Sequence, residues 1–135
     1  HQRYREIVSG RSTGLGGDRY YGYEEDLQAQ VQRNLEGFGL SLTGDHIQLV
    51  KGLFEDTLVG DSPVAVAHID CDWYQSVKTC LERIWPRLVP GGTLVIDDYY
   101  HWSGCQRAVD EFVGPMGAGE VRLVERSRLQ MVKER

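Results

Sequence analysis

The stretch VAVAHI at Val64–Ile69, followed at once by DCD at residues 70–72, decides the fold predicted for this chain. A second apolar run, TLVI at residues 93–96, follows a PGG turn and ends in Asp97 and Asp98. Continuous β-branched and aliphatic runs of this kind are typical of buried parallel strands. Ligands of open α/β sheets bind beyond the carboxyl ends of the strands, so we expect Asp70, Asp97 and Asp98 to meet in one crevice. Carboxylates that lie so close favour a cation between them, and oxygen ligands favour Mg²⁺, Ca²⁺ or Mn²⁺.

The segments around these two runs alternate between helical and extended patterns. Apolar residues recur at helical spacing over residues 23–38 and 75–88, and Pro86 is expected to distort the end of the second helix. A third helix is predicted over residues 103–112, with Ser103 as its N-cap. The remaining predictions are a strand at 46–50, a loop or short helical turn at 51–58, and a terminal antiparallel hairpin at 121–124 and 129–132. This order predicts an α/β fold whose parallel strands are joined by right-handed crossovers.

Composition limits the class of protein. The chain has 135 residues, of which 41% are hydrophobic and 26% charged, as in a single globular domain. A net charge of −5 without a basic run argues against nucleic acid as a partner. No apolar stretch approaches the roughly 20 residues of a membrane span, and no secretory signal is recognised. Three cysteines without a CxxC pair favour a reducing compartment, so we expect a cytoplasmic protein.

The first 22 residues are polar and rich in Gly, Arg and Tyr. They contain GLG at residues 14–16, which matches part of a phosphate-binding glycine loop. Such a loop directly follows a strand and opens a helix, whereas here only EIV at residues 6–8 precedes it. The segment is therefore interpreted as a mobile loop.

Several motifs taken together resemble a known family. They are HIDCDWY at residues 68–74, PGG at 90–92 and IDDYY at 96–100. This set is similar to the macrocin, mycinamicin and novobiocin type of sugar O-methyltransferase, which are class I enzymes dependent on S-adenosylmethionine (SAM) and Mg²⁺. The resemblance covers about residues 20–113. It implies a Rossmann-like sheet and an O-methyltransferase of antibiotic biosynthesis that acts on a hydroxyl of a sugar or related natural product, with a small-molecule acceptor as partner, no nucleic acid or membrane, and homo-oligomer formation left open.

The resemblance also implies roles for individual residues. Asp70 matches the family's metal ligand that also serves as catalytic base, and Asp97 and Asp98 match its two other metal ligands. The residues matched to the SAM pocket are Gly52, Phe54, Glu55, Cys71 and Asp72. Acceptor contacts are expected at Tyr99, Tyr100 and Trp102.

One part of the family pattern is missing. Class I methyltransferases begin with a strand and a glycine-rich acidic loop, and their second strand ends in an acid that binds ribose; the chain has neither. We therefore expect the C-terminal part of a single methyltransferase domain at residues 23–135, preceded by a flexible, lid-like segment at 1–22. Val64–Ile69 would then lack the neighbour that the family's first strand provides and expose an apolar edge.

Simpler interpretations compete with these roles. Asp72 is interpreted first as a cap of the following helix, and His68 as a core histidine within an apolar strand. Asp70 and Asp72 also form a DxD motif, which glycosyltransferases use to hold a metal-bound sugar nucleotide, although Asp97 and Asp98 would then be unexplained. A third interpretation is a truncated, non-catalytic remnant that binds metal weakly or pairs with another chain.

Overall fold

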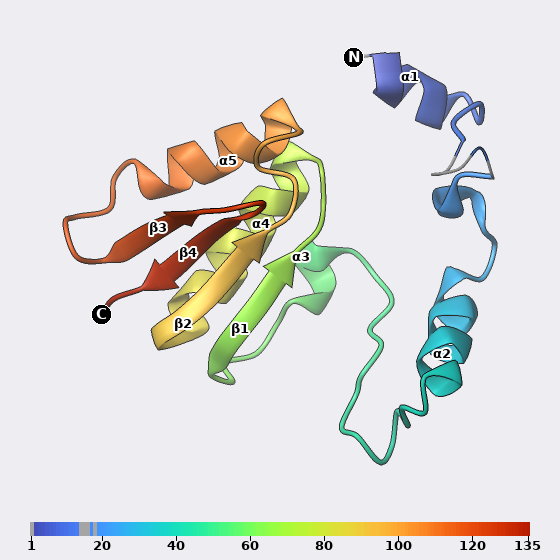
Figure 1. Cartoon of the computed structure of the whole chain (residues 1–135), viewed down its shortest axis with the longest axis horizontal. Coiled ribbons are helices and arrows are strands. Elements are labelled where there is room, and N and C mark those ends of the chain that lie inside the picture. Colours follow the sequence, from blue (N-terminus) through green and yellow to red (C-terminus); the bar gives the residue numbers. More distant parts are fainter. Residues whose placement is uncertain (1, 14–16, 18) are drawn as a thin grey trace. The chain divides into compact units, whose positions relative to one another are not determined.

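The computed structural model describes residues 2–13, 17 and 19–135. It divides the chain into two compact units, His1–Lys51 and Gly52–Arg135 (Figure 1). The GLG stretch that was interpreted as a mobile loop, residues 14–16, lies outside the described residues.

The first unit is built from short helices. Helix α1 spans Gln2–Val8, a 3-10 helix (η1) spans Tyr21–Tyr23, and α2 spans Leu27–Gly37. The structure corrects the loop expected over residues 1–22, because α1 lies within it. The helix expected from residue 23 begins later, because Asp26 caps α2 by accepting a hydrogen bond from the backbone N–H of Ala29 at 3.1 Å.

The strand expected at residues 46–50 is wrong. These residues carry no strand in the structure, and His46 has a left-handed backbone with φ of 56°. The apolar pattern there was too short to distinguish a strand from a loop, and a strand forms only where a neighbouring strand pairs with it.

The second unit contains a four-stranded sheet. Its strands are β1 (Val64–Ile69), β2 (Leu88–Ile96), β3 (Val121–Glu125) and β4 (Leu129–Lys133), in the order β1-β2-β4-β3 (Figure 1). The pair β1-β2 is parallel, and β4 pairs antiparallel with both β2 and β3. This arrangement confirms the α/β class and the C-terminal hairpin, and it leaves β1 at an edge of the sheet.

Two amphipathic helices supply the core of this unit. Helix α4 (Tyr74–Ile84) follows β1, and α5 (Ser103–Val113) follows β2. A further short helix, α3, spans Phe54–Thr57. Pro86 lies in a 3-10 turn (η2, Trp85–Arg87), as its restricted backbone predicts. The buried hydrophobic residues form one cluster from the sheet and these helices: Ile69, Val77, Cys80, Leu81, Ile84, Leu88, Leu94, Ile96, Cys105, Ala108, Val109, Leu129 and Met131.

Two details of the predicted elements are corrected. Ser103 is not an N-cap; Trp102 occupies that position of α5 without a side-chain hydrogen bond. Strand β2 begins at Leu88, so the PGG turn lies within it, and the pairing with β1 shifts register between Val64 and Val66. Gly92 permits this, because a Cβ there would lie 2.8 Å from the Val89 carbonyl oxygen and 3.0 Å from that of Ala65.

The sheet face away from the core is exposed at β1. Val66 is 69% exposed, and the His68 side chain is 54% exposed. His68 is therefore not a core histidine. Side chains alternate across a strand, so His68 points to the opposite face from its buried neighbour Ile69, which packs in the core cluster.

Candidate metal centre

The three aspartates singled out in the sequence do converge. Asp70 follows β1, and Asp97 and Asp98 follow β2. Ile69 and Ile96 are paired in the parallel ladder, and the Asp97 backbone N–H donates to the Ile69 carbonyl at 3.0 Å, so the two strands end level. One ligand oxygen from each aspartate lies within 4.8 Å of the others. The expected convergence of the three carboxylates is therefore present at the carboxyl ends of the strands.

Asp98 is the member of this cluster that most needs a cation. Its Oδ2 atom is buried and has no hydrogen-bond partner. Burial raises the pKa of Asp98 to about 6, and the nearby carboxyl of Asp72 adds to this effect, as do Asp70 and Asp97. A buried, unpartnered oxygen among like charges is costly, and a divalent cation would satisfy both the oxygen and the charge. Carboxylate oxygens are also the donors that Mg²⁺ prefers, so the residues present fit this metal.

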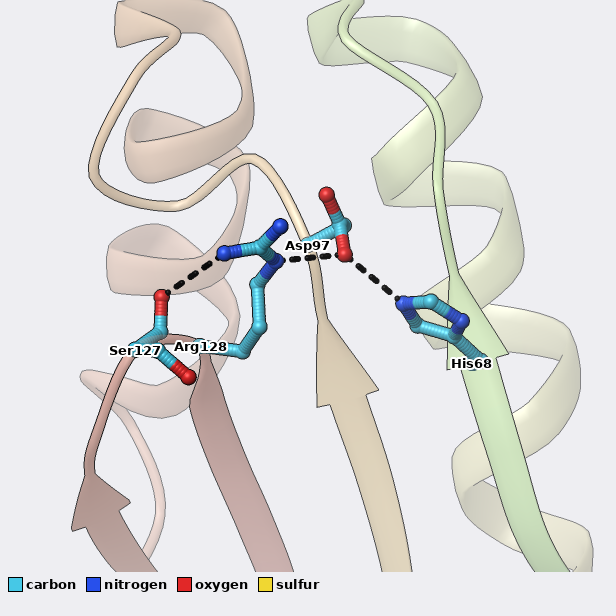
Figure 2. Close-up of polar contacts among 4 residues, drawn as sticks. All are labelled: His68, Asp97, Ser127 and Arg128. Carbon is cyan, nitrogen blue, oxygen red and sulfur yellow. Dashed lines mark hydrogen bonds and ion pairs between the residues drawn. The ribbon is translucent and has the colours of Figure 1, made fainter.

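Asp97 is held by two basic side chains. Its Oδ1 atom accepts a hydrogen bond from Arg128 Nε at 2.5 Å and lies 3.0 Å from His68 Nε2 (Figure 2). The pKa of Asp97 lies below its ordinary value, chiefly because the Arg128 guanidinium donates a hydrogen bond to the carboxylate. Partial burial opposes this shift, and the contact with His68 adds to it. Sequence reasoning missed both partners. The predicted hairpin placed Arg128 in a turn, but its pattern carries no signal for which strand end that turn would meet.

The residues next to Asp70 make contacts that the sequence did not predict, and their cofactor role stays a prediction. Trp73 is the N-cap residue of α4 and makes no side-chain cap bond, so Asp72 does not occupy the N-cap position. The Asp72 carboxyl instead lies near enough to Asp98 to raise the pKa of that residue. Cys71 is half-buried, and a hydrogen bond with Cys80 together with burial raises its pKa. Burial also raises the pKa of Cys105, to about 12. Cys71, Cys80 and Cys105 are all free thiols.

The segment matched to the adenine side of the cofactor pocket lies beside α4. Thr79 on α4 donates from Oγ1 to Glu55 Oε1 at 3.3 Å. Gly52 has φ of 154°, and a Cβ there would lie 2.5 Å from Thr57 Cγ2. Phe54 is 38% exposed, so part of its ring remains open to a ligand. Glu55 is not in the carboxylate cluster, and the cofactor role of this segment stays a prediction.

The aromatic residues after the strands divide into packed and open ones. The Tyr99 hydroxyl donates to Asp110 Oδ1 at 2.7 Å, which fixes its ring over α5. The rings of Trp73 and Trp102 pack edge to face, with 5.5 Å between their centroids, beside the starts of α4 and α5. Tyr100 remains 45% exposed. Of the three residues expected to contact an acceptor, Tyr99 is hydrogen bonded to α5 and Trp102 packs against Trp73. Tyr100 is the one whose side chain remains largely exposed to solvent.

Comparison with known proteins places the chain in a family. Residues 21–118 match the family model of macrocin O-methyltransferase (TylF), and the chain belongs to that family. It is 39% identical over 93 residues to 8-demethyl-8-(2,3-dimethoxy-alpha-L-rhamnosyl)-tetracenomycin-C 4'-O-methyltransferase of Streptomyces olivaceus, a match that covers 67% of this chain and 34% of that protein. It is 32% identical over 88 residues to demethyldecarbamoylnovobiocin O-methyltransferase of Streptomyces niveus, covering 63% of this chain and 32% of that protein. The chain thus spans about a third of the length of these relatives.

The fold is also similar to that of a solved O-methyltransferase. The structure of the O-methyltransferase NovP superposes with a TM-score of 0.67 at 28% identity, over 80% of this chain and 45% of NovP. The Rossmann-like class I methyltransferase fold inferred from the motifs is therefore confirmed for the part that this chain contains. Among the described residues, no helix is both long and apolar enough to cross a membrane.

Proposed function

We propose that the protein carrying this chain transfers a methyl group from SAM to a hydroxyl of a sugar or related natural product, with Mg²⁺ held by Asp70, Asp97 and Asp98. The observation that carries this proposal is the convergence of these three carboxylates at the ends of a parallel strand pair in a chain of this family. The named relatives support the acceptor class, since their names describe O-methylation of a rhamnosyl tetracenomycin and of a novobiocin precursor.

The three aspartates take different roles in this proposal. Bound Mg²⁺ would supply Lewis-acid polarisation of the acceptor hydroxyl, and SAM would supply an activated methyl group. Asp97 and Asp98 anchor the metal from the end of β2. Asp70 is exposed, so its carboxylate is accessible to a bound acceptor, and it accepts the proton that the hydroxyl loses. The remaining contribution of the protein is to position acceptor and donor in line.

The proposed SAM pocket comprises Gly52, Phe54, Glu55, Cys71 and Asp72. The hydrogen bond from Thr79 to Glu55 connects the segment that holds Glu55 to helix α4. Helix α4 begins two residues after Asp72, so the two segments of the proposed pocket are attached to the same helix. The partly exposed ring of Phe54 offers a surface on which an adenine can stack. Tyr100, at the end of β2, is the proposed acceptor contact.

The rival functions make different demands on the same residues. A DxD glycosyltransferase needs Asp72 as a metal ligand, but the cluster joins Asp70 to Asp97 and Asp98 instead. A non-catalytic remnant would be consistent with the exposed edge of β1. In that case the protein would bind neither SAM nor metal at stoichiometric levels.

The proposal is tested by methyl transfer from radiolabelled SAM to a panel of rhamnosyl and other deoxysugar glycosides. We expect transfer that EDTA abolishes and Mg²⁺ restores. Asp97→Asn and Asp98→Asn should lose the response to Mg²⁺, whereas the exposed Asp61→Asn serves as a matched control and should retain it. Transfer that persists in EDTA would contradict the metal role. A protein that does not bind SAM in a stoichiometric amount would favour the non-catalytic remnant.

A further inference from the structure

Asp97 differs from the other two aspartates of the cluster in that one of its oxygens is doubly occupied. Arg128 Nε and His68 Nε2 both approach Oδ1. Figure 2 shows both contacts ending on this one oxygen of Asp97 and none drawn to the other. An ionised carboxylate only accepts hydrogen bonds, so the Nε2 atom of His68 carries a proton and donates it. The two basic side chains therefore leave one specific oxygen of Asp97 for another ligand.

The sheet itself delivers the two partners to this oxygen. Ile96 pairs with Leu129 in the antiparallel ladder, so Arg128, which directly precedes β4, stands opposite Asp97. His68 comes from the other side, because β1 runs parallel to β2 and His68 pairs with Val95. Asp97, which follows β2, is thus contacted from the neighbouring strands on both sides of β2.

The geometry distinguishes this contact from an ordinary surface ion pair. The Asp97 side chain is only 22% exposed, whereas Glu134, which pairs with Arg122 on the same hairpin, is 40% exposed. The Arg128 guanidinium is further fixed by donating from Nη1 to the Ser127 carbonyl at 3.1 Å. Less solvent screening and a fixed guanidinium make the contact to Asp97 stronger and more directional than the exposed pair.

We propose that Arg128 and His68 are positioning residues that hold the Asp97 carboxylate so that its free oxygen is presented to the metal. The inference rests on the proposed function, since it requires a divalent cation at the cluster. Hydrogen bonds to the distal atoms of metal-binding groups orient these groups and adjust affinity. Arg128 also contributes a positive charge beside three carboxylates, which reduces their mutual repulsion before a cation binds. Arg128 lies beyond the part of the chain that matches the family model, which ends at residue 118.

The test measures Mn²⁺ affinity, with free Mn²⁺ followed by electron paramagnetic resonance, in the protein carrying this chain. Arg128→Gln and His68→Phe each remove one donor to Asp97, and each should weaken binding about 10- to 100-fold. Arg128→Lys keeps the charge but not the planar donor, so it should recover part of the loss. Arg122→Gln is the matched control, because it breaks an exposed ion pair on the same hairpin and should leave the affinity unchanged.

The outcomes separate this inference from the proposed function. If Asp98→Asn abolishes Mn²⁺ binding while Arg128→Gln binds as tightly as the parent, the positioning role is wrong and the metal site stands. Tighter binding by Arg128→Gln would show that the guanidinium competes with the metal, which also overturns the inference. Failure of the parent protein to bind Mn²⁺ would overturn both. An equal loss in Arg122→Gln would show that the hairpin fold, and not the contact to Asp97, accounts for the effect.

Discussion

The two units of the chain differ in how they are held together. Every buried hydrophobic residue of the described chain belongs to Gly52–Arg135, whereas the described part of His1–Lys51 buries only Ser12. The apolar stripe of α2 shows the contrast, since Leu27 is 38% exposed and Val31 37% exposed. On α4, by comparison, Val77 and Leu81 are fully buried.

This difference explains why the chemistry gathers in the second unit. Three carboxylates can be held close together only by a scaffold whose packing energy offsets their electrostatic repulsion. The sheet and its two helices provide such a scaffold at the ends of β1 and β2. The helices of the first unit, which lack a core of their own among the described residues, offer no comparable support.

The largest expected effect is on the chemistry assigned to the second unit. Asp70→Asn should lower methyl transfer by about 10²- to 10⁴-fold, because an amide cannot accept the proton of the hydroxyl. Asp72→Asn should weaken transfer much less. Turnover of the two variants with radiolabelled SAM checks this, with Asp61→Asn as a control. Near-normal turnover of the Asp70 variant would exclude it as the base.

A matched pair of leucines tests the packing contrast directly. Leu81→Ala on α4 should cost about 2–5 kcal/mol of unfolding free energy, because it leaves a cavity in the core. Leu27→Ala on α2 should cost less than about 1 kcal/mol, since the side chain is partly exposed and alanine favours a helix. Urea denaturation of both variants measures the difference. Equal losses would show that α2 is as firmly packed as α4.

Asp98→Asn should separate stability from metal binding. The folded pKa of Asp98 is raised, chiefly by burial, so the metal-free protein is stabilised at low pH and loses that stability as the pH rises through about 6. The variant should therefore be more stable than the parent at pH 7.5, by on the order of 1 kcal/mol, with little difference at pH 4. Thermal unfolding in EDTA at the two pH values measures this. A less stable variant at pH 7.5 would contradict the repulsion inferred at this carboxylate.

The smallest effect is expected at the exposed edge of the second unit. Apolar edge strands pair with other chains, and a lysine on such a strand opposes this. Val66→Lys should therefore reduce any self-association of the 135-residue chain without changing its fold, because Val66 is already 69% exposed. Sedimentation at several concentrations would show the change. Identical sedimentation of a parent chain that associates would place its contact elsewhere.

Predictions from periodicity succeeded where one face of an element is buried. Of the apolar residues of the helix expected at 75–88, Val77, Leu81 and Ile84 lie on α4 and are buried. The fourth, Leu88, is buried too, but it is the first residue of β2, because α4 ends at Ile84. The predictions failed where local sequence competes with tertiary pairing. Residues 46–50 have a strand-like composition but no partner strand, and residues 90–92 form part of β2 although PGG favours a turn.

The sequence by itself determined that the aspartates at the strand ends converge, because the carboxyl ends of neighbouring parallel strands lie at the same edge of the sheet. The motif also sufficed to indicate the family. Only the tertiary structure decided what surrounds those aspartates: the unpartnered oxygen of Asp98, the contact of Asp72 with Asp98, and the grip of His68 and Arg128 on Asp97. These contacts depend on the register between strands far apart in the chain, with Arg128 and Asp97 separated by 31 positions. Register is set by packing across the whole sheet, which no local pattern records.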